Sequence, residues 1–275
     1  MNEEHLQRRI AEIGAERSLT AVSVAIHDYQ TDRSFEMDGG RWFHAASVIK
    51  LAVLLGVFKA VEDGMLRLDD PVHVRNRFRS VVDGAVYRVE RDRDGDAECH
   101  RRVGRTMQIA ELSRAMIVRS SNIATNLLVD LLGLEFVRRT LSAAGVEGVR
   151  MMRGVEDHAA FERGINNEMT SAGARQLLRV MHENGFLRQE SRDRIREILL
   201  AQEFNAMIPA QLPDNVEVAH KTGEISTHSH DAGLVFPEGR KPYVAAIFTQ
   251  SEAAVDQRTR AVAEISAAIY AELTT

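Results

Sequence analysis

Two hydrophobic patterns divide this chain, and their order constrains the fold more than any other feature of the sequence. Runs rich in β-branched residues lie near both ends, at Ala21–Asp28 and Ser34–Met37 and again between residues 216 and 250. Between them, apolar residues recur at helical spacing to about Leu200. The first pattern predicts strands and the second predicts helices. We therefore expect one sheet, built from both ends of the chain around a helical block.

The C-terminal part of the predicted sheet has three strand candidates, VEVAHKTG, DAGLVF and PYVAAIFTQ, which proline and glycine turns separate. With the two N-terminal runs they make a five-stranded antiparallel sheet. Amphipathic segments at His5–Arg17 and Ala254–Leu273 predict helices that flank this sheet. The predicted fold class is therefore α/β.

The central block begins with VIKLAVLLGVFKAVEDG, which is apolar nearly all round and predicts a buried helix that ends at Gly64. Further helices are expected at Met107–Arg119, Asn122–Leu132, Leu134–Ala144 and Ser171–Gly185. We predict a sheet lobe from residues 1–43 and 205–275 and an all-α lobe from residues 44–204. The cleft between the two lobes is the expected active site.

The charges argue against a strongly electrostatic partner. The 40 acidic and 35 basic side chains are scattered along the chain and give a net charge of −5, so neither nucleic acid nor an anionic membrane is an expected partner. No stretch approaches the roughly 18 apolar residues of a membrane-spanning helix, and the N-terminus lacks the features of a secretory leader. We expect a monomer that is cytoplasmic as the sequence stands, or periplasmic or secreted if a leader was removed.

Cys99 is the only cysteine, which excludes an intrachain disulfide and a thiolate zinc cluster. It lies within Arg88–Arg105, a stretch of mixed charge with Gly95 and Gly104 as turn formers. We interpret this stretch as a solvated excursion and expect the thiol to be exposed. We expect the protein to need no cofactor and no metal.

Three histidines have ordinary structural explanations. His228 and His230 alternate with Asp231 beside them, so on a strand they could mimic a metal site. Exposed edge positions, or hydrogen bonds to loop carbonyls, explain the two histidines more simply. We interpret His44, three residues before Ser47, as a packed or capping residue rather than a base.

The residues Ser47-Val48-Ile49-Lys50 place a hydroxyl and an amine one turn apart at the start of the predicted buried helix. A serine needs an adjacent base to act as a nucleophile, and a lysine serves as that base when burial lowers its pKa. The apolar sequence around Lys50 supplies this burial. The helix N-terminus also leaves the Ser47 backbone N–H available as half of an oxyanion hole. Taken alone, the spacing fits an N-cap serine and a solvated lysine equally well.

Two further motifs follow: SSN at residues 120–122 lies between two predicted helices, and KTG at residues 221–223 ends a predicted strand. In this order the three motifs resemble the S-x-x-K, S-D-N and K-T-G set of class A β-lactamases and penicillin-binding proteins. The resemblance covers most of residues 20–272. It implies the β-lactamase/transpeptidase-like fold, with the site between a mixed lobe and an all-α lobe.

The resemblance also implies catalytic roles. Ser47 attacks the substrate carbonyl, and Lys50 takes part in proton transfer. Ser120 relays a proton to the leaving nitrogen, and Lys221 holds this network and the substrate carboxylate electrostatically. Glu156 follows Ser120 by 36 residues, an offset similar to that of the family's deacylating general base. Only this spacing favours Glu156 over Asp157 or Glu162.

Four residues are implied to bind substrate. By the resemblance, Asn122 binds the substrate's amide side chain and Thr222 binds its carboxylate. Gly223 lies beside them, and the backbone N–H of Glu224 completes the oxyanion hole.

The sequence departs from the family at three places. Ala160 stands where an asparagine normally shares the hydrolytic water with the general base, unless Asn166 or Asn167 replaces it through a different loop conformation. Ser121 stands where an aspartate normally braces its loop, and a neutral serine lacks charge-assisted strength. Glu224 begins a bulky, acidic rim, which repels a penicillin carboxylate by roughly 1 kcal/mol at a water-like dielectric.

The predicted function is acyl-enzyme hydrolysis of a β-lactam by a serine hydrolase, with weak or narrow turnover. An acyl trap, in which acylation outruns hydrolysis, is the variant that the missing asparagine suggests. The alternatives on the same scaffold are an esterase and a D-alanyl-D-alanine peptidase. A non-enzymatic penicillin-recognising sensor, which keeps Ser47 and Lys50 only as fold residues, is the alternative from a different class.

Overall fold

The computed structural model describes residues 1–274 and joins both ends of the chain in one antiparallel sheet, in the order β10-β11-β12-β1-β2. Its strands are β1 (Ala21–Asp28), β2 (Arg33–Met37), β10 (Glu217–Ile225), β11 (His228–Phe236) and β12 (Tyr243–Gln250). The two ends meet where β1 pairs with β12, with Ala21 opposite Gln250 and Asp28 opposite Tyr243. The five-stranded antiparallel sheet predicted from the two ends is confirmed.

Strand β12 lies in the middle of this sheet and is apolar on both faces. Its residues alternate between two hydrophobic clusters: Tyr243, Ala245 and Ile247 belong to one, and Val244 and Phe248 to the other. Because alternate residues of a strand point to opposite faces, each face of the sheet carries its own core. The sheet is therefore the middle layer of three.

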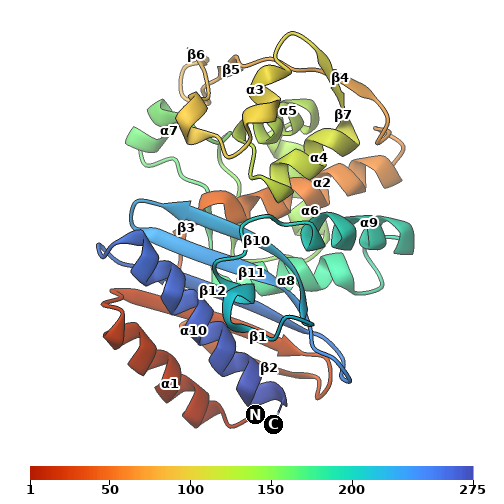
Figure 1. Ribbon diagram of the computed structural model, residues 1–275. Coiled ribbons are helices and arrows are strands. Elements are labelled where there is room, and N and C mark those ends of the chain that lie inside the picture. The colour runs from red at the N-terminus through yellow and green to blue at the C-terminus, as the bar shows by residue number, and fades with distance from the viewer. Residues whose placement is uncertain (275) are drawn as a thin grey trace.

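The first face is covered by the terminal helices α1 (Glu3–Glu16) and α10 (Val255–Thr274), which lie side by side (Figure 1). Leu6, Ile10 and Ile265 are among their buried apolar residues and belong to the cluster on this face. The two predicted flanking helices are thus confirmed, and the two ends of the chain lie close together (Figure 1).

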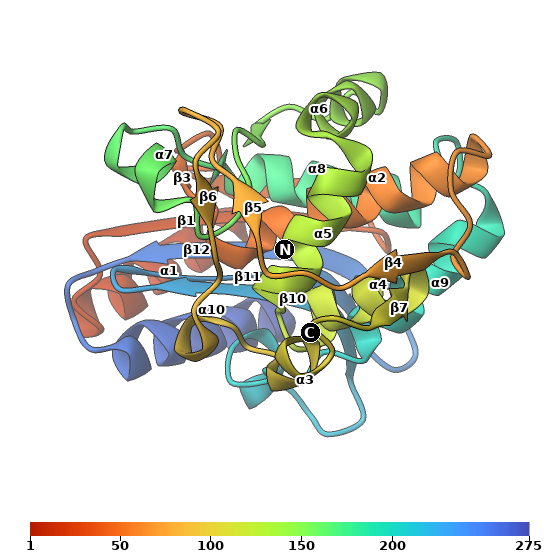
Figure 2. The same ribbon diagram turned by 90° about the horizontal axis from the view of Figure 1, so that it is seen from above.

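The second face packs against helices from the middle of the chain. Helix α8 (Ser171–His182) contacts β1, β11 and β12. Helix α2 (Lys50–Glu62) has ten buried residues out of thirteen, as expected of the predicted central helix. Helix α5 (Asn122–Leu132) contacts α2 and crosses it in the view from above (Figure 2). The helical block therefore contacts the sheet through α8, through helix α9 (Gln189–Leu200) and through the short turn Ala46–Ile49 that precedes α2.

Most of the remaining helices and short strands lie above the sheet in Figure 1, whereas the 3-10 turn η3 contacts α10. The helices are α3 (Ala97–Arg101), α4 (Ile109–Val118), α6 (Leu134–Ala143), α7 (His158–Glu162) and α9 (Gln189–Leu200), with 3-10 turns η1 (Ala46–Ile49), η2 (Arg91–Arg93) and η3 (Ile208–Gln211). The short strands are β3 (Phe43–His44), β4 (Pro71–His73), β5 (Phe78–Arg79), β6 (Val86–Tyr87), β7 (Thr106–Gln108), β8 (Val149–Arg150) and β9 (Glu168–Met169). The helix expected from Met107 starts at Ile109, because β7 pairs with β4.

No helix within residues 1–274 combines the length and the apolar character needed to cross a membrane. The predicted division into lobes at residues 43 and 204 stays a prediction. Helix α8 lies in the predicted helical lobe by sequence yet packs directly on the sheet, so the two lobes share a large apolar contact.

The prediction of an exposed Cys99 is wrong. Helix α3 turns its charged residues outward and places Cys99 in the larger hydrophobic cluster, where the side chain has no exposed surface. A short amphipathic helix explains the error, because a mixed-charge sequence still buries one side of a helical turn. Burial also raises the pKa of the Cys99 thiol to about 12, so the group is protonated at neutral pH.

Candidate active site

Ser47 lies in the tight turn η1, directly before α2. The turn is fixed by a hydrogen bond from the Ala46 backbone N–H to the His44 Nδ1 atom (3.1 Å) and by one from the Val48 N–H to the Ala45 carbonyl (3.1 Å). The neighbours of Ser47 on both sides are buried, whereas Ser47 itself is partly exposed. It lines a large pocket that Ser120, Glu156 and Thr222 also line. The predicted helix thus starts as a 3-10 turn that presents one hydroxyl to the pocket.

Lys50, one turn further on, is completely buried. Its Nζ atom donates to the Ser120 carbonyl oxygen (2.7 Å) and to the Asn122 Oδ1 atom (2.7 Å), and it lies 3.1 Å from the Ser120 Oγ atom. Burial lowers the pKa of Lys50 to about 7, against the raising effect of Asp94 and Glu156. A large fraction of Lys50 is therefore a neutral amine near pH 7, as the apolar sequence around it predicts.

The SSN motif forms the turn between α4 and α5, and Lys50 joins it to the nucleophile's helix. Ser121 is the N-cap of α5, and its Oγ atom accepts a hydrogen bond from the Ala124 N–H (3.2 Å). The Ser121 N–H donates to the Ala115 carbonyl (3.0 Å). Ser120 and Asn122 both line the pocket. The hydroxyl predicted to relay a proton and the side-chain amide predicted to bind substrate therefore lie on one wall of it.

The KTG motif lies on β10, which is an edge strand of the sheet. Lys221 is completely buried, and its Nζ atom donates to the Thr222 carbonyl (2.7 Å). Burial lowers the pKa of Lys221 well below its usual value, and the nearby Lys50 lowers it further. Thr222 lines the pocket beneath the exposed rim residue Glu224.

Gly223 brings β10 into contact with the nucleophile's turn. A Cβ atom at this position would lie 3.0 Å from the backbone nitrogens of both Ser47 and Val48, closer than such contacts normally allow. Only glycine lets the strand approach this closely. The third residue of the KTG motif therefore has a geometric reason to be glycine, whether or not it touches a substrate.

The backbone is strained at three points of the site. Of six non-glycine residues with positive φ among residues 1–274, three are Ala46 (φ 46°), Ser120 (φ 56°) and Glu156 (φ 60°). The left-handed conformation costs an L-residue about 1–2 kcal/mol. Such strain is kept where the surrounding structure enforces it, and it is concentrated at functional sites.

Glu156 lines the same pocket as Ser47, opposite the sheet edge. Its carboxylate forms an ion pair with the Arg93 guanidinium, with 2.6 Å between Nε and Oε2, and the His158 Nε2 atom lies 3.5 Å from the same oxygen. The Glu156 side chain is 17% exposed. The structure thus brings the predicted general base into the pocket, with one oxygen already paired.

The two rival acids have other positions. Asp157 is buried and caps α7, because its Oδ1 atom accepts from the Ala160 N–H (3.2 Å) and its Oδ2 atom accepts from the Val81 N–H (3.0 Å). Glu162 is exposed on α7. Geometry therefore favours Glu156 among the three carboxylates.

The expected partner of a hydrolytic water is absent from the position four residues after Glu156, where Ala160 is buried. Asn167 lines the pocket, but its amide already bonds the loop: Oδ1 accepts from the N–H groups of Met152 (2.7 Å) and Arg153 (3.1 Å), and Nδ2 donates to the Arg153 carbonyl (3.0 Å). Asn167 therefore braces the Glu156 loop from within.

His44 and His230 form hydrogen bonds that hold the backbone near the site. Both ring nitrogens of the buried His230 are used, since Nε2 lies 3.1 Å from the His44 carbonyl and Nδ1 accepts from the Thr249 N–H (3.2 Å). The predicted hydrogen bond to a loop carbonyl is instead one to the carbonyl of His44 in the short strand β3. The predicted exposed edge position is wrong, because β11 is an internal strand and both His228 and His230 are buried. Burial lowers the pKa of His44 to about 4 and that of His230 to about 3, so both are neutral at pH 7.

The pocket has a volume of about 1290 Å³ and lies where the sheet edge, the SSN turn and the Glu156 loop meet. It is larger than the roughly 300–1,000 Å³ of most small-molecule sites, so it has room for a bicyclic substrate with a side chain. Its charged lining includes Arg93, Arg153, Glu156, Asp157, Glu203, Glu224, Asp256 and Arg260. Acidic groups outnumber basic ones in this lining, in keeping with the acidic rim expected from the sequence.

The structure also corrects the prediction of a solvated excursion at Arg88–Arg105. Arg93 lines the pocket, and the side chain of Asp94 has no exposed surface. Both residues contact site residues that the motifs identify: Arg93 pairs with Glu156, and Asp94 accepts from the Asn122 backbone N–H (3.0 Å). Sequence reasoning missed them because a run of mixed charge is typical of a solvent-exposed loop. The turn formed by Gly95 was the one signal of a fixed conformation.

Known proteins are similar to this chain in both sequence and fold. The sequence matches the β-lactamase enzyme family over residues 5–273. A β-lactamase of Bacteroides uniformis is 27% identical over 241 residues, which cover 83% of this chain and 78% of that protein. A β-lactamase of Rhodobacter capsulatus is 26% identical over 254 residues, which cover 91% of this chain and 82% of that protein.

Solved structures give the same result. A β-lactamase from Sphaerobacter thermophilus is 22% identical with a TM-score of 0.85, covering 100% of this chain and 98% of that one. An ancestral class A β-lactamase is 25% identical with a TM-score of 0.83, covering 97% and 99%. A mutant of PBP-A, in an acyl-enzyme complex with penicillin G, is 22% identical with a TM-score of 0.83, covering 98% of this chain and 97% of that one. The predicted β-lactamase-like fold is confirmed, and by its match over residues 5–273 this chain belongs to the β-lactamase enzyme family.

Proposed function

We propose that this protein is a serine hydrolase of the class A type that opens β-lactams through an acyl-enzyme on Ser47. The observation that carries the proposal is the state of Lys50, a fully buried amine with a pKa of about 7, one turn from Ser47. A general base works best when its pKa lies near the working pH. Burial of an ionisable amine costs stability, which hydrogen bonds such as those to Ser120 and Asn122 offset in part.

In the proposed acylation step, neutral Lys50 accepts a proton. A neutral amine has two N–H donors, and the Ser120 carbonyl and the Asn122 side chain take both of them. The lone pair of the Lys50 Nζ atom then remains free to accept a hydroxyl proton. The Ser47 hydroxyl proton passes to Lys50 as the Ser47 Oγ atom forms a bond to the β-lactam carbonyl carbon. When the carbon–nitrogen bond breaks, the Ser120 hydroxyl gives its proton to the leaving nitrogen and takes one from Lys50, whose Nζ atom lies 3.1 Å from the Ser120 Oγ atom.

The remaining residues bind substrate and stabilise charge. The backbone N–H groups of Ser47 and Glu224 form the proposed oxyanion hole, and Gly223 permits their close approach. Asn122 binds the amide side chain of the substrate. Thr222 binds its carboxylate, which Lys221 stabilises from beneath the strand.

In the proposed deacylation step, Glu156 takes a proton from a water that attacks the acyl carbon, and Ser47 leaves. Two observations support slow turnover at this step. The Arg93 guanidinium pairs with the Oε2 atom of Glu156 without a hydrogen bond to it, and this oxygen is buried, so the arginine stands where a water would approach. Ala160 offers no polar side chain to hold the water. We therefore expect an acyl-enzyme that persists, and an acyl-enzyme with penicillin G is known in the structure of a PBP-A mutant.

Mass spectrometry after mixing the protein with penicillin G tests the proposal. We expect a covalent adduct of the intact penicillin mass on the wild-type protein and none on Ser47→Ala. Absence of both adduct and hydrolysis would contradict β-lactam chemistry. Saturation kinetics on nitrocefin and on p-nitrophenyl esters separate this function from an esterase, for which the esters would be the better substrates.

A further inference from the structure

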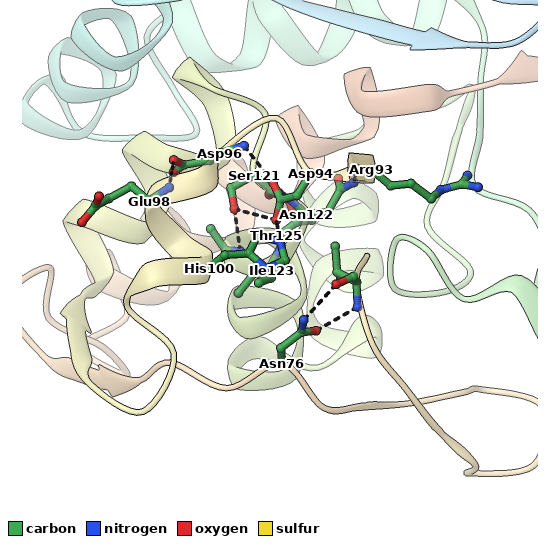
Figure 3. Close-up of polar contacts among 12 residues, drawn as sticks. Asn76, Arg93, Asp94, Asp96, Glu98, His100, Ser121, Asn122, Ile123 and Thr125 are labelled. Atoms are coloured by element: carbon green, nitrogen blue, oxygen red, sulfur yellow. Dashed lines mark hydrogen bonds and ion pairs between the residues drawn. The ribbon is translucent and has the colours of Figure 1, made fainter. Parts of the chain in front are cut away.

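The Asp94 carboxylate is the most completely bonded acid near the site, although none of the three motifs contains it. Its side chain has no exposed surface. The Oδ1 atom accepts from the backbone N–H groups of Asn122 (3.0 Å) and Asp96 (3.1 Å), and the Oδ2 atom accepts from the Ile123 N–H (3.1 Å) and the Ser121 Oγ–H (3.4 Å). Figure 3 shows Asp94 between its own loop and the start of α5.

Two of these donors, the N–H groups of Asn122 and Ile123, are ones that α5 cannot satisfy itself. The first N–H groups of a helix have no partner within the helix, and they carry the positive end of its dipole. Ser121 caps only the Ala124 N–H. Asp94 takes the N–H groups of Asn122 and Ile123, so it caps α5 from a segment 27 residues before Ser121.

The loop that carries Asp94 is itself fixed. At its base the Asn76 side chain pairs with both backbone groups of Val89: Nδ2 donates to the carbonyl (2.8 Å), and Oδ1 accepts from the N–H (2.8 Å) (Figure 3). On the other side of Asp94, Asp96 accepts from the Glu98 N–H (2.9 Å) and pairs with Arg119 (3.1 Å). The carboxylate is thus presented to α5 by a loop that is tied at both ends.

Asp94 and Lys50 hold the same turn from opposite sides. The Asn122 backbone N–H donates to Asp94, and its side-chain Oδ1 atom accepts from Lys50. Its Nδ2 atom donates to the Arg93 carbonyl (2.7 Å). Ser120, directly before the helix cap, has a positive φ and offers two oxygens to Lys50. A strained residue keeps its conformation only when its neighbours are fixed.

We propose that Asp94 is a positioning residue for proton transfer: its carboxylate fixes the Ser120–Asn122 turn so that Ser120 and Asn122 meet Lys50. The aspartate acts through the turn and touches no reacting atom. It supplies the charge that Ser121, a neutral cap, does not. This inference rests on the proposed acylation at Ser47, but part of its test does not.

The first test relocates the carboxylate. Asp94→Asn replaces one acceptor oxygen by a donor facing other donors, and we expect acylation by penicillin G to slow by about 10- to 100-fold, because small misplacements of catalytic groups cost rates of this order. Ser121→Asp alone puts a second carboxylate within hydrogen-bond distance of Asp94 and also slows acylation. The double variant Asp94→Asn/Ser121→Asp restores one carboxylate at the N-cap, where it reaches the same first-turn amides, so we expect acylation to recover most of its wild-type rate.

Asp28→Asn is the matched control, since Asp28 is also a buried carboxylate that accepts hydrogen bonds from its own loop, from the Gln30 N–H (3.1 Å) and the Thr31 hydroxyl (2.7 Å), but lies on β1 away from the Ser120–Asn122 turn. We expect it to lower the melting temperature but to leave the acylation rate within about twofold. Equal losses of rate in Asp94→Asn and Asp28→Asn would overturn the proposal, as would a double variant that folds and acylates no faster than the singles. If Asp94→Asn does not fold, the double variant carries the test.

The pH profile of acylation is a second readout that loss of stability alone does not move. The charged groups that act on Lys50 are Asp94 and Glu156, which raise its pKa, and Lys221, whose pKa is coupled to it. Removing the Asp94 charge lowers the pKa of Lys50, so the rising limb of the rate moves to lower pH. Loss of positioning lowers the plateau rate as well, so a shifted limb with an unchanged plateau in Asp94→Asn would contradict the proposal.

A crystal structure of Asp94→Asn gives the readout that is independent of acylation. We expect Ser120 to leave the positive-φ region and Lys50 to lose its bond to the Ser120 carbonyl. If wild-type protein forms no adduct but this rearrangement occurs, the proposed function fails and the positioning role stands. An unchanged turn would overturn the positioning role, whatever the activity.

Discussion

The two halves of the proposed site differ in how firmly the fold holds them. Lys50 is completely buried and contacts three atoms of the SSN turn, which Asp94 secures from behind. Glu156 lies on a loop, and its main partner is the Arg93 side chain, which is 55% exposed. The acylating half is therefore part of the core, whereas the deacylating half lies on its edge.

This difference suggests which step of the reaction is easier to change. Buried hydrogen-bonded groups lose much when one partner is removed, because the other is left unsatisfied. An ion pair with an exposed arginine contributes about 0–1 kcal/mol and is easily exchanged. Substitutions in the acylating half should therefore slow acylation strongly. Substitutions in the deacylating half should either slow or accelerate deacylation.

The largest expected effect is that of Lys50→Met, which removes the proposed base from the acylating half. We expect the acylation rate to fall by about 10³-fold, within the range of general base catalysis. Only the neutral amine accepts a proton, so the wild-type rate rises with pH through the Lys50 pKa of about 7 and is constant above it. The variant should lack this rise.

Stopped-flow acylation with nitrocefin between pH 5 and pH 9 measures both effects. Lys59→Met, a partly exposed lysine on the same helix, is the matched control and should keep the wild-type profile. A wild-type rate that is independent of pH would contradict a base role for Lys50.

The next effect is expected from Glu156→Gln in the deacylating half. If Glu156 activates the water, deacylation falls by about 10²-fold while acylation stays within a few-fold, because the two steps use different bases. The acyl-enzyme should then persist for much longer in time-resolved mass spectra. Glu162→Gln, an exposed acid on α7, serves as the control, and equal lifetimes for both variants would count against Glu156.

A smaller effect is expected from Gly223→Ala, which tests the contact between the sheet edge and the nucleophile's turn. The added Cβ atom meets the backbone nitrogens of Ser47 and Val48 at 3.0 Å, so the strand or the turn must shift. We expect a destabilisation of about 1–3 kcal/mol, the usual cost of overpacking, and roughly tenfold slower acylation. Denaturant unfolding and burst kinetics measure the two effects. Gly40→Ala, at a position with open space, should change neither.

The smallest expected effect is that of Arg93→Ala, and it has the opposite sign. Removing the guanidinium frees the Oε2 atom of Glu156 for a water, so deacylation should become several-fold faster, an effect of about 1 kcal/mol. Steady-state turnover of nitrocefin measures it, with the exposed Arg91→Ala as the control. Slower deacylation in Arg93→Ala would show that the arginine orients Glu156 rather than occupying it.

Much of the acylating half follows from local sequence. The apolar run around Lys50 predicts the burial that the structure shows, and the spacing of three residues places Ser47 on the turn before it. The SSN and KTG motifs also lie in their predicted contexts, a turn before α5 and a strand. These features are predictable because each depends on a period or a cap within about ten residues.

The deacylating half is less predictable, since an offset of 36 residues does not fix a loop. The sequence places Glu156 near the site but does not reveal that Arg93 pairs with it or that Asn167 is used inside the loop. It also misplaces Cys99, because a charged stretch hides one buried turn of helix. Contacts between segments that are distant in sequence decide all three.

The sequence by itself determined the order of the elements, the five strands from the two ends and the residues of the three motifs, because hydrophobic periodicity and local turns specify them. Only the tertiary structure decided which charged side chain pairs with which residue of the site. Asp94 reaches α5 and Arg93 reaches Glu156 because the chain returns to the site through a loop that local patterns describe as solvent-exposed. Electrostatic and hydrogen-bond partners depend on distance in space, which separation along the chain does not reveal.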